Sequence, residues 1–293
     1  MTSPFVRRHR LGTELRALRQ EAGLTAGRLA DLVHYSRMKV SRLENASCRP
    51  DIPAIIKILK ALNASEEKRQ EVLRIACDAS ERGWWDDYGD SMGARQRLYA
   101  DIEFGAATIR SYSPSTIPGL LQTPETIAAM IKRAEGQGKL NFIPEPMKEA
   151  RLERQRIVLG EGGPVCEFIL DEVVVRRLTI PAKTMAAQLK HIIRVVTAEP
   201  RLSLRILPVD ASIEGALVPT VSFFLYTFSD PADPPMALVE TINADLVHAE
   251  RDEVERYTQI YDHLSRATLS QDDSLMLLRE AADRLNETNG ARQ

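Results

Sequence analysis

Four side chains along one short segment have the chemistry to recognise DNA bases. They belong to a predicted helix between Ser36 and Asn45, in which Met38, Ser41 and Arg42 face outward and Arg37 lies on the flank in the first turn. An arginine that donates two hydrogen bonds to guanine discriminates against other bases by about 1–3 kcal/mol. Because a helix fits the major groove, the segment predicts a recognition helix whose outward side chains contact base edges.

Apolar spacing sets the register of this helix. Val40 and Leu43 are three residues apart and face inward, and Ser36 is a suitable N-cap. The preceding segment predicts a second short helix with Thr25 as its N-cap, and its apolar face is made of Leu29, Leu32 and Val33. Two short helices joined by a tight turn are the layout of a helix-turn-helix motif.

Three further helices complete the predicted domain. Each has an apolar stripe at helical spacing, and Asp51 and Ser65 are suitable N-caps for the fourth and fifth helices. The inward residues are Leu11, Leu15 and Leu18, then Ile55, Ile56, Leu59 and Leu62, then Val72, Leu73 and Ala76. Residues 1–80 therefore predict a compact all-α DNA-binding domain of five helices.

Positive charge is concentrated in the same region. Residues 1–63 contain twelve lysines and arginines against five acids, a net charge of +7, whereas the whole chain has −2, so residues 64–293 carry −9. This asymmetry suits contact with phosphates through the first domain alone. The expected contacts besides the base-reading residues are Arg28, Ser36, Lys39, Asn45 and Arg49. For the basic run 7–10, contact with DNA and a solvated arm remain alternatives.

Several positions resemble the bacterial and phage repressor-like helix-turn-helix domains of the Xre/Cro class. They are Leu24-Thr25, Leu29-Ala30, Ser36, the run from Val40 to Asn45, and Pro50. The resemblance implies an ion pair between Arg19 and Glu44 that fixes the orientation of the helices without reading bases. Because one such domain covers only a few base pairs, we expect a homodimer on an inverted repeat of double-stranded DNA.

Two positions depart from the pattern of this class. Ala26 replaces the glutamine that usually contacts the DNA backbone, and the nearby Arg28 is the expected substitute. Ala46 replaces the glycine that usually follows the Glu-Asn pair. Because asparagine tolerates a positive φ better than alanine does, we expect Asn45 to end the recognition helix.

The rest of the chain predicts a joint and a larger domain, so the overall fold class is α+β. Residues 81–97 form a joint with Trp84 and Trp85, whose rings we expect to pack on the second domain, with stacking on a ligand as the alternative. Residues 98–286 predict a mixed α/β domain with a central mixed sheet, and residues 287–293 a loose tail. Strands are expected at 166–171, 202–207, 221–228 and 236–240, and helices at 98–109, 124–133, 145–158, 183–197, 245–267 and 270–286.

The second domain also resembles a known group. The matching residues include the run 118–123, Arg151, Arg154-Gln155, Asp171-Glu172, Gln188-Leu189, Leu207-Pro208 and Gly215. The pattern is similar to the effector-like domain behind such heads in actinobacterial regulators, including the Scr1-type antitoxin-like group (DUF5753-like), and it implies a small protein partner. The candidate partner or ligand residues are Trp84, Trp85, Pro118, Gly119, Leu120, Leu121 and Gln122.

Other function classes have little support. The sequence has no phosphate-binding loop, dinucleotide glycine motif, zinc helix motif, apolar membrane span or hydrophobic signal region. The cysteines Cys48, Cys77 and Cys166 lack the spacing of metal ligands, which favours free thiols in a reducing cytoplasm. We therefore expect a cytoplasmic protein without membrane contact, catalytic residues, metal or cofactor.

Together these features predict a sequence-specific transcriptional regulator that binds double-stranded DNA through residues 36–45. The second domain is expected to serve dimerisation and the sensing of a partner or a ligand, and the sequence does not identify the small-molecule effector. The alternative is an antitoxin-like protein that binds a small partner protein and autoregulates its operon. Two further interpretations are a ligand-sensing repressor and an enzyme with a DNA-binding head.

Overall fold

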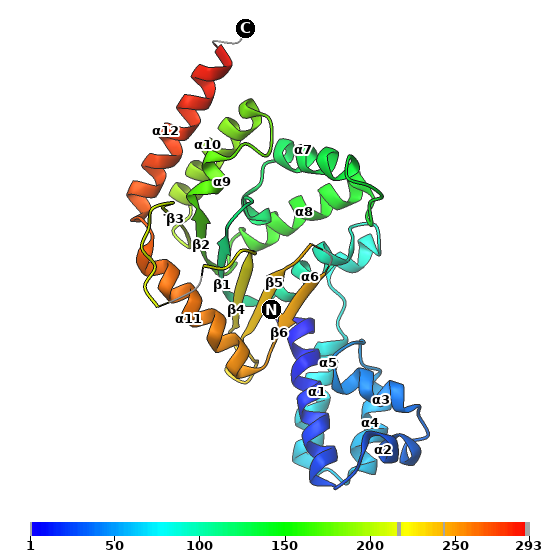
Figure 1. Ribbon diagram of the computed structural model, residues 1–293. Helices are drawn as coiled ribbons and strands as arrows, with labels where there is room; N and C mark the ends of the chain where they lie inside the picture. Colours follow the sequence, from blue (N-terminus) through cyan, green and yellow to red (C-terminus); the bar gives the residue numbers. More distant parts are fainter. Residues whose placement is uncertain (1, 216–217, 243, 291–293) are drawn as a thin grey trace. The chain divides into compact units, whose positions relative to one another are not determined.

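The computed structural model describes residues 2–215, 218–242 and 244–290, and it divides into two compact units (Figure 1). The first unit contains residues 2–87 together with Ala100–Ala106 and Phe228–Pro234. The second contains residues 88–99, residues 107–227 and the chain from Pro235 onward. The first unit therefore extends beyond the expected domain of residues 1–80, and the expected joint at 81–97 is divided between the two units.

Five α-helices build the first unit, as predicted. They are α1 (Pro4–Glu21), α2 (Ala26–Leu32), α3 (Arg37–Glu44), α4 (Ile52–Ala61) and α5 (Glu66–Ser80), followed by the 3₁₀ turn η1 (Trp84–Tyr88). Four of the helices begin at a side chain that accepts a hydrogen bond from an amide of the first turn: Ser3, Thr25, Ser36 and Ser65. Each such cap stabilises its helix by about 1 kcal/mol.

Helices α1 to α4 all end in the same way. The residue after each C-cap has a positive φ, between 50° and 69°: Gly23, His34, Ala46 and Asn63. The next amide donates back to the start of the last turn, as Ser47 N does to Arg42 O at 2.9 Å. This is the Schellman arrangement. Asn45 is the C-cap of α3, so the helix ends where we expected, but Asn45 has a φ of −99° and Ala46 takes the left-handed conformation instead.

The apolar core of the first unit is formed by all five helices. Its buried residues include Leu11, Leu15, Leu29, Ala30, Val33, Val40, Leu43, Ile55, Ile58, Leu59, Val72 and Ile75. Leu32 was expected among them, but it is 56% exposed. Helix α2 has only seven residues, and Leu29, Ala30 and Val33 fill the side that faces the core.

The basic residues at the start of α1 are neutralised by acids. Arg7 lies 2.9 Å from Asp230 and 3.3 Å from Asp233. Arg10 contacts the same two carboxylates at 2.9 Å and 3.3 Å. Residues 7–10 are therefore part of a helix bound to the segment Phe228–Pro234 of the first unit. The run is therefore not a solvated arm in this conformation.

The segment Ala100–Ala106 supplies a second set of contacts inside the first unit. Arg8 pairs with Asp101, and the Ser3 hydroxyl donates to the Asp101 carbonyl at 2.7 Å. The Trp85 ring is buried and meets Phe104 edge to face, with 5.3 Å between ring centroids. These contacts explain why the first unit does not end at residue 80. Because the expected second domain began at residue 98, the packing of Trp85 on Phe104 agrees with the expectation, although both residues belong to the first compact unit.

The second unit is built around a mixed six-stranded sheet, so the predicted α+β class is confirmed (Figure 1). The strands are β1 (Ala106–Ser113), β2 (Val165–Asp171), β3 (Leu202–Leu207), β4 (Phe223–Phe228), β5 (Met236–Glu240) and β6 (Asp245–His248). The helices are η2 (Gly119–Leu121), α7 (Pro124–Glu135), α8 (Pro144–Val158), α9 (Glu172–Arg176), α10 (Ala182–Ala198), α11 (Arg251–Ala267) and α12 (Gln271–Gly290), with the part of α6 (Ala94–Glu103) that precedes residue 100. Every helix in the described part of the chain is too short or too polar to cross a lipid bilayer.

The sheet has the order β3-β2-β1-β4-β5-β6. Strands β1, β2 and β3 are parallel, with Ile109 beside Cys166 and Cys166 beside Leu202. Strand β5 pairs antiparallel with β4 and with β6, as the short connections predicted. Tyr261 and Leu264 of α11 pack on an apolar cluster contributed by β1 to β5. In Figure 1 the helices α10 and α12 lie side by side at the β3 end of the sheet.

Three expected elements differ in the structure. The helix expected at 98–109 ends at Glu103, because β1 follows and pairs with β2. The helix expected from residue 245 begins at Arg251, because residues 245–248 form β6 beside β5. In both cases pairing with a neighbouring strand overrides the local spacing of apolar residues. Helix α12 continues to Gly290, so residues 287–290 of the expected loose tail are helical, and residues 291–293 lie outside the described residues.

Candidate nucleic-acid interface

Helix α3 presents an apolar face to the core and a polar face to solvent. Val40 and Leu43 are buried, whereas Arg37, Met38 and Arg42 are exposed, Met38 to 71%. The division follows from the helical period of 3.6 residues, which places these two sets on opposite sides. Three of the four predicted base-reading side chains therefore lie on the open surface of the helix.

The start of α3 combines a capping hydroxyl with the positive end of a helix. The Oγ of the exposed Ser36 accepts a hydrogen bond from the Lys39 amide at 3.1 Å. A hydroxyl used in this way keeps its own hydrogen for donation to another acceptor. Because unsatisfied amides and the helix dipole favour anions at this end, the first turn suits a phosphate oxygen.

The ion pair implied by the resemblance is present. Arg19 donates to both carboxylate oxygens of Glu44, at 2.6 Å from Nε and 2.9 Å from Nη2. The same guanidinium donates to the Leu24 carbonyl at 2.8 Å. The hydrogen bond that Arg19 donates to Glu44 raises the pKa of Arg19, so the guanidinium stays charged. The pair joins α1, the last turn of α3 and the loop before α2, which holds α3 in its orientation.

The cations of the helix-turn-helix segment differ from those of α1. Arg28, Arg37 and Arg42 are exposed, and their side chains have no hydrogen bond or ion pair within the residues that the structure describes. Arg7 and Arg10, by contrast, are held by two carboxylates. A neutralised guanidinium gains less from a phosphate or a base than a solvated one does. Exposed arginines without an ion pair are therefore present on α2 and α3.

Three other predicted contact residues are partly engaged. The Lys39 ammonium lies 3.8 Å from the centre of the Tyr35 ring. Ser41 is partly exposed, and its hydroxyl accepts a hydrogen bond from the Asn45 side chain at 3.2 Å. Asn45 also accepts a hydrogen bond from Arg16 at 2.7 Å. These contacts orient the side chains on the outer side of α3 and leave Asn45 exposed.

Arg49 differs from the expectation. Its guanidinium pairs with the carboxylate of Asp86 at 2.7 Å, and the Gly83 amide donates to the same carboxylate at 3.2 Å. In this conformation Asp86 of η1 binds the guanidinium that we had expected to contact a phosphate.

Comparison with known proteins matches the chain to two family models. Residues 10–72 match a helix-turn-helix domain. Residues 96–280, which are more than half of the chain, match the domain of unknown function DUF5753. The chain belongs to the DUF5753 family. No curated protein and no solved structure matches it. The chain is thus a DNA-binding regulator with a helix-turn-helix domain at residues 10–72, which a DUF5753 domain follows along the sequence.

Residues 118–122 of the DUF5753 domain, expected at a partner or ligand, lie in a buried turn. Leu120 and Leu121 are buried, and Gln122 is nearly so. The Gln155 amide donates to the carbonyls of Gly119 and Gln122 at 2.7 Å and 2.8 Å. Burial of this turn excludes direct contact between its leucines and a ligand in this conformation. The buried turn at residues 118–122 instead fixes the path of the chain between β1 and α7.

The two tryptophans were also candidates for contact with a partner or a ligand. Trp85 is 1% exposed, so its ring offers no surface on which a ligand could stack. Trp84 is partly exposed and meets Trp85 edge to face, with 6.0 Å between ring centroids. The two rings therefore contribute to the apolar packing of the first unit.

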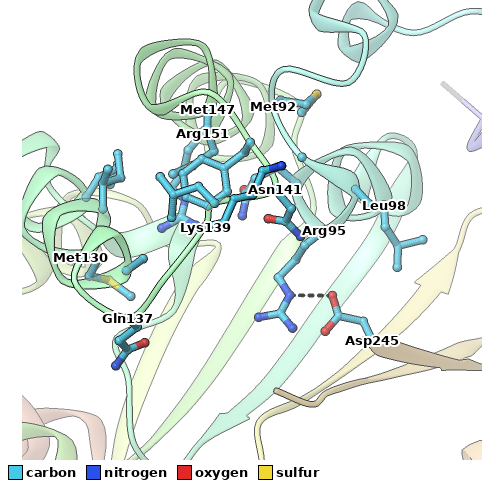
Figure 2. Close-up of a pocket in the computed structure, with 18 of the residues that line it drawn as sticks. Met92, Arg95, Leu98, Met130, Gln137, Lys139, Asn141, Met147, Arg151 and Asp245 are labelled. Carbon is cyan, nitrogen blue, oxygen red and sulfur yellow. Dashed lines mark hydrogen bonds and ion pairs between the residues drawn. The ribbon is translucent and has the colours of Figure 1, made fainter. Parts of the chain in front are cut away.

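The DUF5753 domain contains a cavity of about 910 Å³ that the sequence did not predict (Figure 2). Its walls come from α6, α7, the loop at 137–142, α8 and the connection between β5 and β6. Figure 2 shows Arg95 facing Asp245 on one side, with Met130 and Gln137 on the other. Because these segments are far apart in the sequence, no local motif marks the cavity.

Proposed function

We propose that this chain is a sequence-specific transcriptional regulator that places α3 in the major groove of double-stranded DNA. The observation that best supports this is the state of the arginines. Those of α3, Arg37 and Arg42, are exposed and have no partner in the described residues, whereas those at the start of α1 are neutralised. In the complex the two arginines donate to base edges, and Met38 contacts a thymine methyl group.

Contacts to the DNA backbone come from Arg28, Ser36 and Lys39, which surround the turn between α2 and α3. Because one such domain covers only a few base pairs, the protein binds as a homodimer with half-sites about one helical turn apart. The bidentate pair between Arg19 and Glu44 supports assignment of the first unit to the Xre/Cro class.

We further infer that the DUF5753 domain receives a signal from a small molecule. The cavity of about 910 Å³ supports this role, since its size falls in the range of ligand pockets. It favours a small ligand over the antitoxin-like alternative, in which a small partner protein binds and the operon is autoregulated. Purification of the chain from its host separates the two, because a stoichiometric small protein would support the alternative.

Footprinting of the full chain on its own upstream region tests the DNA-binding proposal. We expect two protected half-sites with centres about one helical turn apart, or a multiple of it, and weaker binding as salt rises. Arg28→Ala is expected to weaken binding to all sequences and to lower the salt slope by about one. Arg156→Ala, which removes an exposed cation of α8, is the matched control and should leave binding unchanged. Equal binding to all sequences would contradict sequence-specific recognition.

A further inference from the structure

The cavity of the DUF5753 domain combines an apolar wall with an excess of positive charge. The apolar wall is formed by Ile127, Met130 and Ile131 of α7 with Met147 of α8. Such a wall binds the apolar body of a ligand through burial of its surface, at about 25 cal/mol per Å². The polar groups of the cavity then select ligands by the chemistry of their head group.

Arg151 of α8 is the most informative of these polar groups. Its Nη1 donates to the Gln122 side chain at 2.6 Å, which is a neutral acceptor. Its Nε is buried without a hydrogen-bond partner among the described residues. Burial, followed by repulsion from Arg154, lowers the pKa of Arg151 to about 10. A buried guanidinium in this state lacks a counter-ion, which is costly unless an anion binds.

The acids near the cavity are already engaged. Asp245 pairs with Arg95 at 2.9 Å, as the dashed line in Figure 2 shows. Glu240 accepts the Tyr99 hydroxyl at 2.5 Å and forms no ion pair with Arg151 within the described part of the chain. Arg151 therefore forms no ion pair with a carboxylate in the described part of the chain, although the charge of Glu240 acts on it at longer range.

Two further features favour an anion in the same space. Lys139, on the loop at 137–142, lines the cavity and has no acidic partner in the described residues. The first turn of α6, at Gly93 to Gln96, also lines it. The start of a ten-residue helix carries partial positive charge. Arg151, Lys139 and this turn come from three separate segments, and all of them favour negative charge.

We propose that this cavity binds an amphipathic anion, a single carboxylate or sulfonate on an apolar body, with Arg151 as the counter-ion of the head group. The proposal rests on the inference that the DUF5753 domain receives a small-molecule signal. The apolar body lies against α7 and Met147, and the head group lies toward α8 and the first turn of α6. Gln122, from the buried turn at 118–122, positions Arg151 through its side-chain oxygen.

Two fluorescent probes of one skeleton test the proposal with the full chain. Anilinonaphthalene sulfonate carries the anionic group, and phenylnaphthylamine is the same skeleton without it. We expect saturable binding of the sulfonate at one site per chain. Arg151→Met should weaken that binding by about tenfold or more, equivalent to about 1.4 kcal/mol, and change binding of the neutral probe less than twofold. Arg156→Met removes an exposed arginine of the same helix and is the control.

Competition and cavity filling complete the test. Decanoate should displace the bound sulfonate, and decanol at the same concentration should not. Met130→Trp should reduce binding of both probes, because it fills the apolar wall. A melting temperature near that of the original chain shows that each variant is folded, which matters because the sulfonate also binds partly unfolded proteins.

Equal loss of both probes in Arg151→Met, or unchanged sulfonate binding, would overturn the proposal. Displacement by decanol as readily as by decanoate would also overturn it. Because no DNA is present, this result is independent of the DNA-binding proposal. The effect of decanoate on footprints, measured separately, tests whether the cavity regulates DNA binding.

Discussion

Gly12 of α1 lies directly against the Glu44 carbonyl at the end of α3. A Cβ placed on Gly12 would be 2.5 Å from that oxygen and 3.1 Å from the Leu43 carbonyl. Backbone atoms cannot move aside as a flexible side chain can, so a side chain here must separate the two helices. The glycine thus lets α1 support the recognition helix from behind, beside the pair between Arg19 and Glu44.

Gly12→Ala is expected to destabilise the first unit by about 2 kcal/mol, the usual cost of overpacking. Gly27→Ala is the control, because its nearest atom would be 3.9 Å away, and alanine favours the helix by about 0.5–1 kcal/mol. Urea unfolding followed by tryptophan fluorescence reports on the first unit alone, since both tryptophans belong to it. Equal stability of the two variants would contradict the close approach of α1 to α3.

The left-handed conformation of Ala46 suggests that glycine at this position would stabilise the first unit. Its φ of 55° is a conformation that costs a residue with a Cβ about 1–2 kcal/mol and costs glycine little. Ala46→Gly should therefore stabilise the first unit by about 1 kcal/mol in the same urea experiment. The change leaves the side chains of α3 in place, so affinity for DNA should stay within twofold. A loss of stability would show that Ala46 is not left-handed in solution.

The low pKa of His9 is expected to make the free energy of unfolding depend on pH. Burial, with a smaller effect of Arg8, lowers the pKa of His9 from 6.5 to about 4. Between these values the unfolded chain binds the proton and the folded chain does not, so stability falls as pH falls. At about 1.36 kcal/mol per pKa unit, the loss approaches about 3 kcal/mol by pH 4.

Urea unfolding of the original chain and of His9→Gln between pH 7 and pH 4 measures this effect. Burial raises the pKa of Asp101 and of Asp233, which changes stability in the opposite direction, but both acids are present in both proteins. The difference between the two curves therefore isolates His9. We expect it to grow below pH 6.5, and a constant difference would refute the assignment.

Arg8 and Asp101 form a buried pair whose loss should be costly. Both side chains are only 11–12% exposed, and Asp101 also accepts the Phe5 amide at 3.1 Å. Arg8→Met leaves this carboxylate without a cation, and we expect a loss of about 3 kcal/mol at pH 7. The loss should shrink as pH falls, because burial raises the pKa of Asp101 and favours its protonated form. A double-mutant cycle with Asp101→Asn measures the coupling, which would be near zero if the pair were absent.

The helix-turn-helix segment was largely predictable because its signals are local. Thr25 and Ser36 act as the N-caps that their positions suggested, and Val40 and Leu43 are buried at the expected spacing. Strands β3 and β5 also match their predicted bounds, because alternation or a short apolar run marks them. Leu32 was wrongly expected to be buried. Helix α2 has only two turns, and so short a segment does not define which of its apolar residues face the core.

Other features depend on contacts that the sequence does not reveal. The acids that neutralise Arg7 and Arg10 lie more than 200 residues further along the chain. Residues 106–113 form a strand because β2 lies beside them, although Ile102, Ala106 and Ile109 have helical spacing. The cavity around Arg151 likewise exists only when segments from α6 to β6 come together.

The central claim is that exposed arginines of α3 read bases, and Arg42 tests it most directly. Binding of the full chain and of Arg42→Ala should be measured across a library of operator sequences at one salt concentration. Arg10→Ala, which removes a paired arginine of α1, is the control. We predict that Arg42→Ala relaxes discrimination at one base position per half-site by about 1–3 kcal/mol, while Arg10→Ala keeps the original preference. Unchanged discrimination at every position in Arg42→Ala would contradict the account.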